Sequence, residues 1–463
     1  MNTEKPILKG FYKTLFSLAF PIILQNLMQT FVNMLDTIMV GRLGAVEIAS
    51  VGLGNQIFFM LNMVIFGICS GGSIFISQFW GQNNIKGIRN TTGIMVLCSF
   101  VVSIIFMCGA IFIPNSLLKL YTNDIAVINE GVKYLSVIAL SYPINAICFA
   151  LQMSFRSTEH VYLPMTCTAV SLVSNAILNI ILIFGLNLTI SNVNVYIPAM
   201  GVKGAAFATL ISRVIELIIV LSYSICKKFE VWGAIRDFFD FDTKFLKKIA
   251  IVCLPVIFSE TCWGLGITIQ NSIFAHSGTD AIAAFNITNT ISQLTWVFFI
   301  GLGNAAAIIL GKKIGAGDEI GAKAYVGRFS WFMPLLGGII GLFLFPLSKL
   351  LPFIFNVDNH IIKIATSMIY VLICVYPLRA FNMLLIVGIC RSGGDTIFGM
   401  LDDNGWMWLV AVPLGFLAAF YWNLNPWMIM MCLESEQLFK AIFGIMRIKS
   451  GKWLHNLTKV NYS

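Results

Sequence analysis

Long apolar stretches without a charged residue dominate the chain. Asp, Glu, Lys and Arg are absent from residues 48–85, 161–202, 281–311 and 404–433. A helix needs about 20 apolar residues to cross a bilayer, so each run holds one spanning helix, a turn and part of a second. A transmembrane β-barrel would show shorter segments of alternating polarity, which the sequence lacks. The pattern therefore predicts an all-α polytopic membrane protein.

Proline, glycine and polar breaks between the apolar runs predict twelve transmembrane helices. They cover residues 13–41, 46–78, 91–113, 131–155, 163–186, 202–226, 248–275, 281–310, 326–348, 361–388, 398–421 and 426–446. Because the number of spans is even, we expect both termini on the same side of the membrane.

Lysine and arginine are divided unequally between the two sides of the membrane on which the predicted loops fall. One side holds only Arg42, Lys119, Lys133, Lys203, Lys349 and Lys363. The other side collects most of the rest, and we count Arg391 and Lys440 among them. Short cytoplasmic loops are enriched in basic residues, so we predict a multi-pass protein of the inner or plasma membrane with both termini cytoplasmic. The net charge of +9 then indicates contact with anionic membrane lipids and not with nucleic acid.

Composition agrees with this interpretation. The chain is 58% hydrophobic and 11% charged, whereas soluble domains carry about 25% charged residues. The eleven cysteines lie mostly inside apolar runs and show no CxxC or Cys/His metal spacing. We interpret them as buried hydrophobic residues, and expect neither disulfides nor a bound metal or cofactor.

The two halves of the chain resemble each other. An offset of 234 residues aligns rare residues without a gap: Pro21 with Pro255, Gly44 with Gly278, Gly67 with Gly301, Gly81 with Gly315, Gly87 with Gly321, Asp124 with Asp358, and Tyr142-Pro143 with Tyr376-Pro377. This predicts an internal duplication, with an N-lobe at 1–226, a cytoplasmic connection at 227–247 and a C-lobe at 248–463. Six spans per lobe make the repeats parallel and related by a pseudo-twofold axis, an arrangement typical of transporters that bind substrate between two rocking halves.

Polar residues inside the first predicted helix lie on one face. Asn26, Gln29, Asn33 and Asp36 are spaced three, four and three residues apart, which places them on one side of a helix. Asn and Gln also join helices by hydrogen bonds, so packing and cavity lining both remain open for them. A carboxylate inside the membrane is costly and usually functional, so we favour a functional role for Asp36 over a buried ion pair.

Glu260 is the second acid within a predicted span. Its counterpart under the offset is Asn26, while that of Asp36 is Gln270, so the two lobes differ in charge. Burial disfavours the charged form of a carboxyl, so either acid could carry a proton, or stay ionised and bind a metal cation or a cationic substrate. Glu216 follows Arg213 by three residues, which predicts a structural ion pair on one helix.

The fifth predicted helix carries Asn175 and Asn179, four residues apart on one face. Amide carbonyl oxygens suit a hard cation better than a soft metal. This spacing by itself is a weak signal.

Several motifs occur in the order found in one transporter family. They are Pro21 and Gln25, Asp36 followed by Met39–Gly44, Ser77–Gln82, Asn175 and Asn179, Gly201–Ala206 leading to Thr209, Pro255 with Glu260, and Arg391 with Gly394–Thr396. In these residues the chain resembles the multidrug and toxic compound extrusion (MATE) transporters, in particular bacterial NorM-, MepA- and DinF-like members. The resemblance covers nearly the whole chain and implies the MATE/MOP-type fold.

The resemblance implies secondary active efflux of amphipathic, often cationic compounds by alternating access, driven by Na⁺ or H⁺ antiport. It implies a cation-coupling site at Asp36, Asn175, Asn179 and Thr209, where many relatives have Asp in place of Asn179. NorM-type members pair the helix 7 glutamate with an aspartate in helix 10. Residues 376–382 contain Arg379 and no acid, so Glu260 is expected to pair with Arg379 or to contact substrate.

The implied ligands are small-molecule drugs or metabolites, with the coupling ion in place of a cofactor and the protein acting as a monomer. The candidate lining of the substrate cavity consists of Asn26, Gln29, Asn33, Met63, Trp263, Gln270, Tyr376 and Arg379.

Rival functions lack the residues that they need. A flippase for lipid-linked oligosaccharide or peptidoglycan precursor is the closest alternative, but its pyrophosphate headgroup needs several cationic side chains in the cavity, and the helix interiors offer little beyond Arg379. An enzyme is not expected, because the four histidines fall at helix ends or in loops and no H-E-x-x-H motif is present. A G-x-x-x-x-G-K-[ST] nucleotide loop is absent as well.

Overall fold

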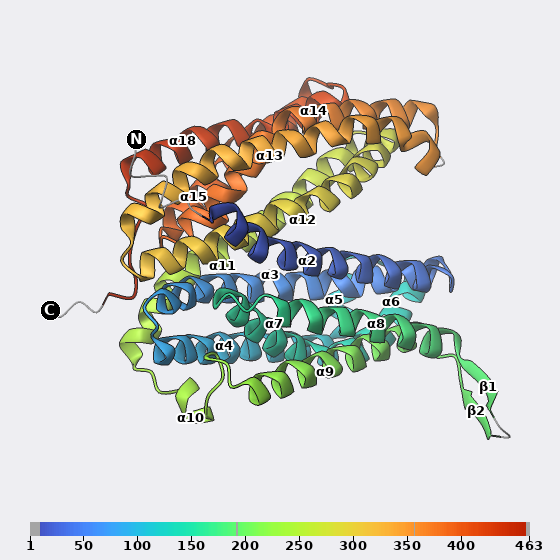
Figure 1. Cartoon of the computed structure of the whole chain (residues 1–463). Coiled ribbons are helices and arrows are strands. Elements are labelled where there is room, and N and C mark those ends of the chain that lie inside the picture. Colours follow the sequence, from blue (N-terminus) through green and yellow to red (C-terminus); the bar gives the residue numbers. More distant parts are fainter. Residues whose placement is uncertain (1–9, 191–192, 356, 460–463) are drawn as a thin grey trace. The chain divides into compact units, whose positions relative to one another are not determined.

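The computed structural model describes residues 10–190, 193–355 and 357–459 and is almost entirely helical (Figure 1). Its helices up to the long central connection are α2 (Phe11–Gly41), α3 (Ala45–Gly81), α4 (Ile85–Phe112), α5 (Pro114–Lys119), α6 (Ile125–Ile138), α7 (Ser141–Ser157), α8 (Tyr162–Phe184), α9 (Val202–Lys227) and α10 (Ile235–Phe238). Those that follow are α11 (Thr243–His276), α12 (Thr279–Gly315), α13 (Glu319–Ile354), α14 (Asn359–Met383), α15 (Thr396–Trp406), α16 (Val412–Phe416), α17 (Pro426–Glu434) and α18 (Glu436–Ser450). Three π-helical segments, η1 (Leu384–Cys390), η2 (Met407–Ala411) and η3 (Leu417–Tyr421), continue or connect the last spans.

The predicted all-α polytopic fold is confirmed. Among the described residues, ten helices are each long and apolar enough to cross a membrane, and α6 with α7 makes an eleventh span that is bent by 51°. The region of the predicted twelfth helix, 426–446, is divided at Ser435 into α17 and α18. Two of the predicted helices are thus broken where the sequence pattern predicts continuous ones.

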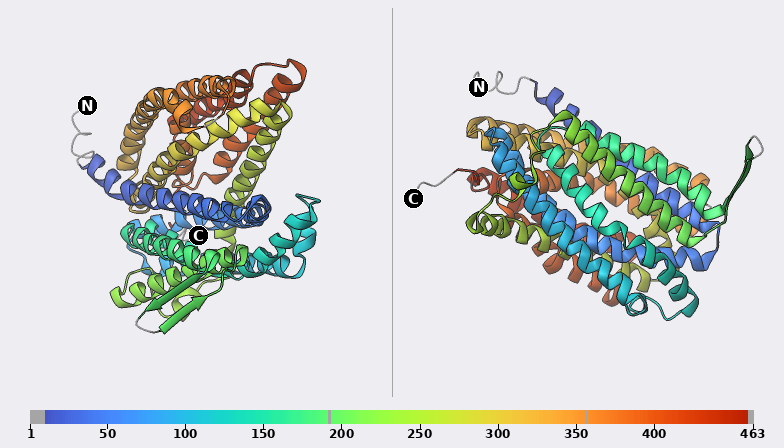
Figure 2. Two further views of the ribbon diagram at one scale, coloured as in Figure 1. Left: turned by 90° about the vertical axis from the view of Figure 1, so that its right-hand side faces the viewer. Right: turned by 90° about the horizontal axis from the view of Figure 1, so that it is seen from below.

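A β-hairpin replaces the end of the predicted helix 163–186. The helix α8 stops at Phe184, and the strands β1 (Leu186–Ile190) and β2 (Val193–Ile197) pair antiparallel, with Leu186 opposite Ile197. The hairpin projects beyond the ends of α8 and α9 (Figures 1 and 2). Gly185 has a φ of 80°, a conformation that glycine adopts without strain, and the apolar/polar alternation after it favours strands.

The chain forms two compact units. The N-terminal unit comprises Leu24–Ile76 and Ile85–Lys247, and the C-terminal unit comprises the described residues of Met1–Ile23, Ser77–Asn84 and Lys248–Ser463. Both α2 and α3 therefore contribute to two units. The proposed functional lobes at 1–226 and 248–463 stay a prediction.

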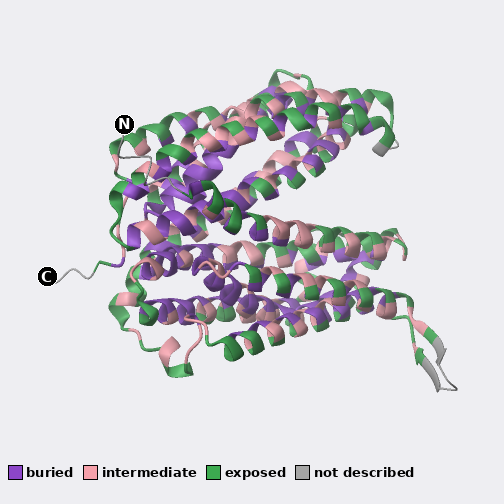
Figure 3. Cartoon of the chain, in the orientation of Figure 1, coloured by how far each residue is buried: buried purple, intermediate pink, exposed green. Residues whose placement is uncertain are grey.

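Helices of the N-terminal unit turn small and polar side chains inward and large apolar ones outward. On α4, Thr91, Ser99 and Ser103 are fully buried, whereas Val101 and Ile105 are 49% and 63% exposed. Figure 3 shows the same mixture of buried and exposed positions along the other helices. Inward-facing small residues with outward-facing apolar residues are the pattern of helices that pack against each other in lipid.

Within the C-terminal unit, the ends of α3 and α12 cross at two glycines. A Cβ atom on Gly81 would lie 2.0 Å from the carbonyl oxygen of Lys312, and one on Gly315 would lie 1.9 Å from that of Gln78. The offset of 234 residues that relates Gly81 to Gly315 also relates Gln78 to Lys312. The crossing is therefore symmetric under the offset, as an internal duplication with a twofold axis requires.

Alanine at either glycine of this crossing is expected to destabilise the protein. The added methyl group overlaps a backbone oxygen, so the helices must move apart, and overpacking of this kind costs about 1–3 kcal/mol. The thermal unfolding midpoint in detergent measures the effect for Gly81→Ala and Gly315→Ala. Gly327→Ala is the matched control because its Cβ would meet no atom within 4 Å. Unchanged midpoints for both crossing variants would contradict the close approach.

The charged connection between the predicted lobes is docked on the start of α4. Arg89 donates from Nη1 to Asp237 at 2.9 Å and from Nε to the carbonyl of Glu230 at 3.1 Å. Lys86 lies 2.7 Å from the carboxylate of Asp240 and, by its hydrogen bond and charge, lowers the pKa of that carboxyl. The segment that the sequence presents as a loop thus has a defined place in the N-terminal unit.

Candidate functional site

Four predicted coupling residues meet between α2, α8 and α9 in the N-terminal unit. The Asn179 amide donates from Nδ2 to the carboxylate of Asp36 and to Oδ1 of Asn175, the latter at 3.0 Å. The Asn175 amide in turn donates to the hydroxyl of Thr209 at 3.4 Å. A continuous row of hydrogen bonds therefore links three helices and ends at a carboxylate.

Local helix geometry explains this order. Asn175 and Asn179 are one turn apart on α8 and are buried, at 3% and 0% exposure. The Thr209 hydroxyl donates to the carbonyl of Ala205 one turn earlier on α9, so its lone pairs are left to accept from Asn175. Asp36 is half-buried and is the only ionisable member of the four, which gives the site a single formal negative charge.

The donor atoms of this site suit a proton or a small hard cation. The Asn179 Oδ1 atom is buried and has no hydrogen-bond partner within the part of the chain that the structure describes. With the carboxylate of Asp36, the amide oxygen of Asn175 and the hydroxyl of Thr209, the site presents oxygen ligands only. Oxygen donors are the ligands that hard cations prefer, and a single carboxylate balances a single positive charge.

A second polar network lies deeper in the same unit. Gln25 on α2 donates to Gln152 on α7 at 2.9 Å, and Gln152 donates to Glu216 on α9 at 2.8 Å. Arg213 lies 2.8 Å from Glu216, which confirms the predicted ion pair, and Arg156 donates to Gln25 at 3.1 Å. The sequence pattern missed Gln152, since no spacing along one helix connects it to its partners on two others.

The predicted cavity residues of the N-terminal unit differ in exposure. Asn26, Gln29 and Met63 are partly buried, and Asn33 is exposed. None of these four positions is fully buried, and their role as cavity lining stays a prediction.

In the C-terminal unit the predicted cavity residues separate into two groups. Trp263 and Gln270 are partly buried, and Trp263 stacks on Trp296 with the ring centroids 6.3 Å apart. Tyr376 is fully buried and its hydroxyl shares a hydrogen bond with Thr295. The expectation that Tyr376 lines a cavity is therefore wrong for this structure, because its ring packs in the helix core.

Glu260 has a different partner from the one expected. It forms an ion pair with Arg391, which is only 6% exposed, while Arg379 binds both carboxylate oxygens of Glu434. The expected pairing of Glu260 with Arg379 is wrong, since a planar guanidinium is best satisfied by such a two-pronged contact. Arg391 lies in the turn that follows η1, in agreement with its position between two predicted helices, but its side chain is buried.

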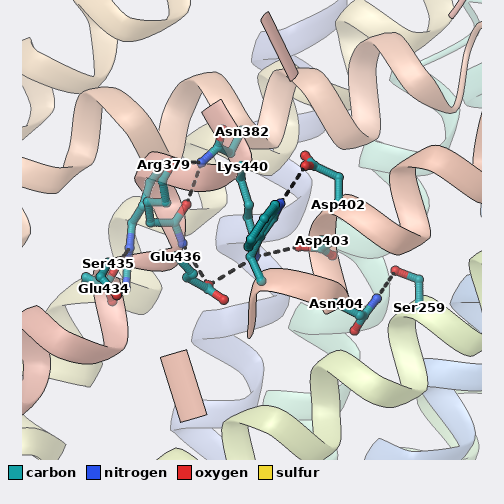
Figure 4. Close-up of polar contacts among 12 residues, drawn as sticks. Ser259, Arg379, Asn382, Asp402, Asp403, Asn404, Glu434, Ser435, Glu436 and Lys440 are labelled. Atoms are coloured by element: carbon teal, nitrogen blue, oxygen red, sulfur yellow. Dashed lines mark hydrogen bonds and ion pairs between the residues drawn. The ribbon is translucent and has the colours of Figure 1, made fainter. Parts of the chain in front are cut away.

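The structure also reveals a buried charged cluster that the sequence pattern did not predict (Figure 4). Lys440 on α18 lies 2.9 Å from Asp403 and 3.0 Å from Glu436, and Asp402 is 3% exposed. These residues flank the charge-free run 404–433, and Lys440, which lies within the predicted helix 426–446, is only 3% exposed. A signal was present, because the Glu436–Lys440 spacing of four residues places both on one helical face.

Comparison with known proteins gives a consistent result. The MatE family model matches residues 21–181 and 255–417, two segments whose starts differ by the offset of the duplication. The probable multidrug resistance protein YoeA of Bacillus subtilis is 24% identical over 427 residues, which cover 91% of this chain and 90% of that protein. The probable multidrug resistance protein NorM of Thermotoga maritima is 24% identical over 451 residues, with 95% and 93% coverage.

Solved structures show the same fold. A single-residue mutant of the Vibrio cholerae MATE transporter VcmN superimposes with a TM-score of 0.87 at 16% identity, covering 98% of this chain and all of that one. A crystal structure of MATE in the straight conformation gives a TM-score of 0.84 at 20% identity, with 95% and 96% coverage. At these identities the likeness establishes the fold alone.

Proposed function

The chain belongs to the MatE family, and we propose that it exports amphipathic, often cationic compounds from the cell in exchange for Na⁺ or H⁺. It is a multi-span membrane protein of a transporter family, and its relatives YoeA and NorM are named as probable multidrug resistance proteins. The observation that carries the proposal is the row of hydrogen bonds that ends at Asp36. It places one carboxylate among neutral oxygen donors inside a helical unit.

The Asp36 site can switch between two states of charge. When Asp36 is ionised, its carboxylate is stabilised by the amide that Asn179 donates. A proton or Na⁺ cancels this charge, and Na⁺ would recruit the unpartnered Asn179 Oδ1 as a further ligand. Occupancy must favour one conformer of the transporter, because an ion that binds two states equally shifts neither.

Membrane vesicles test the coupling directly. We expect ethidium efflux from inverted or whole-cell preparations to respond to an imposed Na⁺ gradient or to an imposed pH gradient, with the two gradients applied separately. The responsive gradient identifies the coupling ion. Efflux that is insensitive to both gradients would contradict antiport.

Flippase activity is not favoured. A pyrophosphate headgroup needs free cationic side chains, but three largely buried arginines are already paired with acids. Arg213 pairs with Glu216, Arg379 with Glu434 and Arg391 with Glu260. Small drugs or metabolites are therefore the better substrates.

We also propose the remaining features of the transporter on the basis of its sequence. The asymmetry of basic residues supports cytoplasmic termini in the plasma or inner membrane, with anionic lipids in contact with that side. The site is built within one chain, so the transporter acts as a monomer and needs no cofactor beyond its coupling ion.

A further inference from the structure

The charged cluster of the C-terminal unit has the properties of a second ion-binding site. It consists of Asp402 and Asp403 on α15 and Glu436 and Lys440 on α18, and we call it the α15–α18 cluster. Lys440 bridges Asp403 and Glu436, while Asp402 accepts a hydrogen bond from the Trp406 indole at 3.1 Å. None of these residues belongs to the Asp36 site.

The cluster holds more acids than bases. Three carboxylates face one ammonium group, so with all of them ionised a net negative charge is buried. The neighbouring arginines do not change this balance, because Arg379 forms an ion pair with Glu434 and Arg391 with Glu260, and each pair adds one negative and one positive charge. Burying an uncompensated charge is costly, and a buried group that lacks a partner charge takes up a proton instead.

Two carboxylate oxygens of the cluster are free to carry that proton. Asp402 Oδ2 and Glu436 Oε2 are buried and have no hydrogen-bond partner among residues 10–190, 193–355 and 357–459. Their residues are only 3% and 6% exposed. An ionised carboxylate normally accepts hydrogen bonds on both oxygens when buried, so these two atoms mark positions where a ligand is missing.

The geometry favours a proton over a metal cation. The Lys440 ammonium already occupies the position between Asp403 and Glu436 and would repel a second cation there. Within the described residues, no group of three acidic, histidine or cysteine side chains is arranged to hold a metal ion. A proton needs one oxygen, whereas a metal cation needs several.

The helices around the cluster are irregular. The π-helical η2 begins at Met407, directly after Trp406, and the break between α17 and α18 falls at Ser435, directly before Glu436. π-Helical segments often mark functional sites. One irregularity directly precedes Glu436, and the other begins after Trp406, which donates to Asp402, so both lie beside the cluster.

We propose that the α15–α18 cluster is a proton-binding site, at which Asp402 and Glu436 take up and release protons while Lys440 remains bound to Asp403. Each uptake moves one proton from water to Asp402 Oδ2 or Glu436 Oε2, and each release returns it to water. The role in transport rests on the proposed antiport, in which the cluster adds its protons to the Na⁺ or H⁺ carried at Asp36.

Infrared spectroscopy during a pH titration tests the binding itself. The full chain is reconstituted in lipid as the Asp36→Asn variant, with ¹³C in its aspartate carboxyl groups to identify their bands. We expect a protonated-carboxyl band near neutral pH that disappears on alkalinisation and carries the aspartate label. The labelled band should be lost in Asp402→Asn, and an unlabelled component should be lost in Glu436→Gln. Glu319→Gln, at an exposed helix start, should leave both bands unchanged.

The outcomes separate the possibilities. A spectrum without any titrating protonated carboxyl, or bands that neither cluster variant alters, would overturn the proposal. Bands that respond to Na⁺ at constant pH would overturn it in favour of a metal cation. The spectrum of the Asp36→Asn protein without further substitutions shows whether any protonated carboxyl titrates, even when a cluster variant does not fold.

Transport measurements separate this proposal from the function itself. With a pH gradient imposed on proteoliposomes, Asp402→Asn and Glu436→Gln should lower the number of protons moved per ethidium. If the unsubstituted protein shows no gradient-driven efflux, antiport fails, while the infrared titration still decides the proton site. An unchanged proton-to-ethidium ratio in both variants would overturn the transport role of the cluster.

Discussion

Replacement of Asp36 by asparagine is expected to abolish ethidium efflux and drug resistance, down to the level of cells without the transporter. The substitution keeps the shape of the side chain but removes the only ionisable group of the row formed with Asn179, Asn175 and Thr209. A neutral site has no charge for a coupling ion to cancel, so the ion can no longer favour one conformer. Efflux assays and immunoblots of the membrane fraction measure activity and expression together.

Two further variants test whether efflux requires the carboxylate of the Asp36 site in particular. Glu319→Gln removes an exposed acid outside the site and should leave efflux unchanged. Exchanging the pair, with Asp36→Asn and Asn179→Asp in one chain, moves the carboxylate across a single hydrogen bond and should restore part of the activity. Full activity of Asp36→Asn alone would rule out the assignment of Asp36 as the coupling group.

Sequence periodicity predicted the spans well and their interruptions poorly. Apolar run length alone determines whether a segment can cross a bilayer, so the positions of helices such as α4 and α12 followed directly. The bend between α6 and α7 and the break at Ser435 depend on contacts with other helices, which leave no period in the sequence. The hairpin after Gly185 had a local signal, but the apolar run masked it.

The polar residues of the N-terminal unit were easier to predict from the sequence than the ion pairs of the C-terminal unit. Asn175 and Asn179 share a helix face, so their spacing pointed to a common site. The carboxylate inside a predicted span singled out Asp36, and family motifs added Thr209 and joined the four residues in one site. In the C-terminal unit, by contrast, the ion pairs that join different helices connect residues more than 30 positions apart, such as Lys440 and Asp403. The sequence pattern gave Lys440 no partner on another helix, so the acids of α15 and α18 were not recognised as a cluster.

The buried pair of Glu260 and Arg391 is expected to contribute strongly to stability. Removing one member takes the ion-pair partner from the other, buried member, at a cost of about 3–5 kcal/mol. Glu260→Gln and Arg391→Gln should therefore each lower the free energy of unfolding by about this amount. Denaturant titration in detergent micelles, followed by intrinsic tryptophan fluorescence, measures the loss.

A double-mutant cycle distinguishes a structural pair from a coupling acid. If Glu260 mainly neutralises Arg391, the variant with both substitutions should be less destabilised than the sum of the single ones, because no unpaired charge remains. The Arg379–Glu434 pair is the matched control, since it joins α14 to α17 in the same unit and should show the same non-additivity. Additive losses at Glu260 and Arg391 would contradict direct pairing. The double variant can also regain stability without regaining efflux. In that case the ion pair is needed for the fold, and Glu260 also acts in transport.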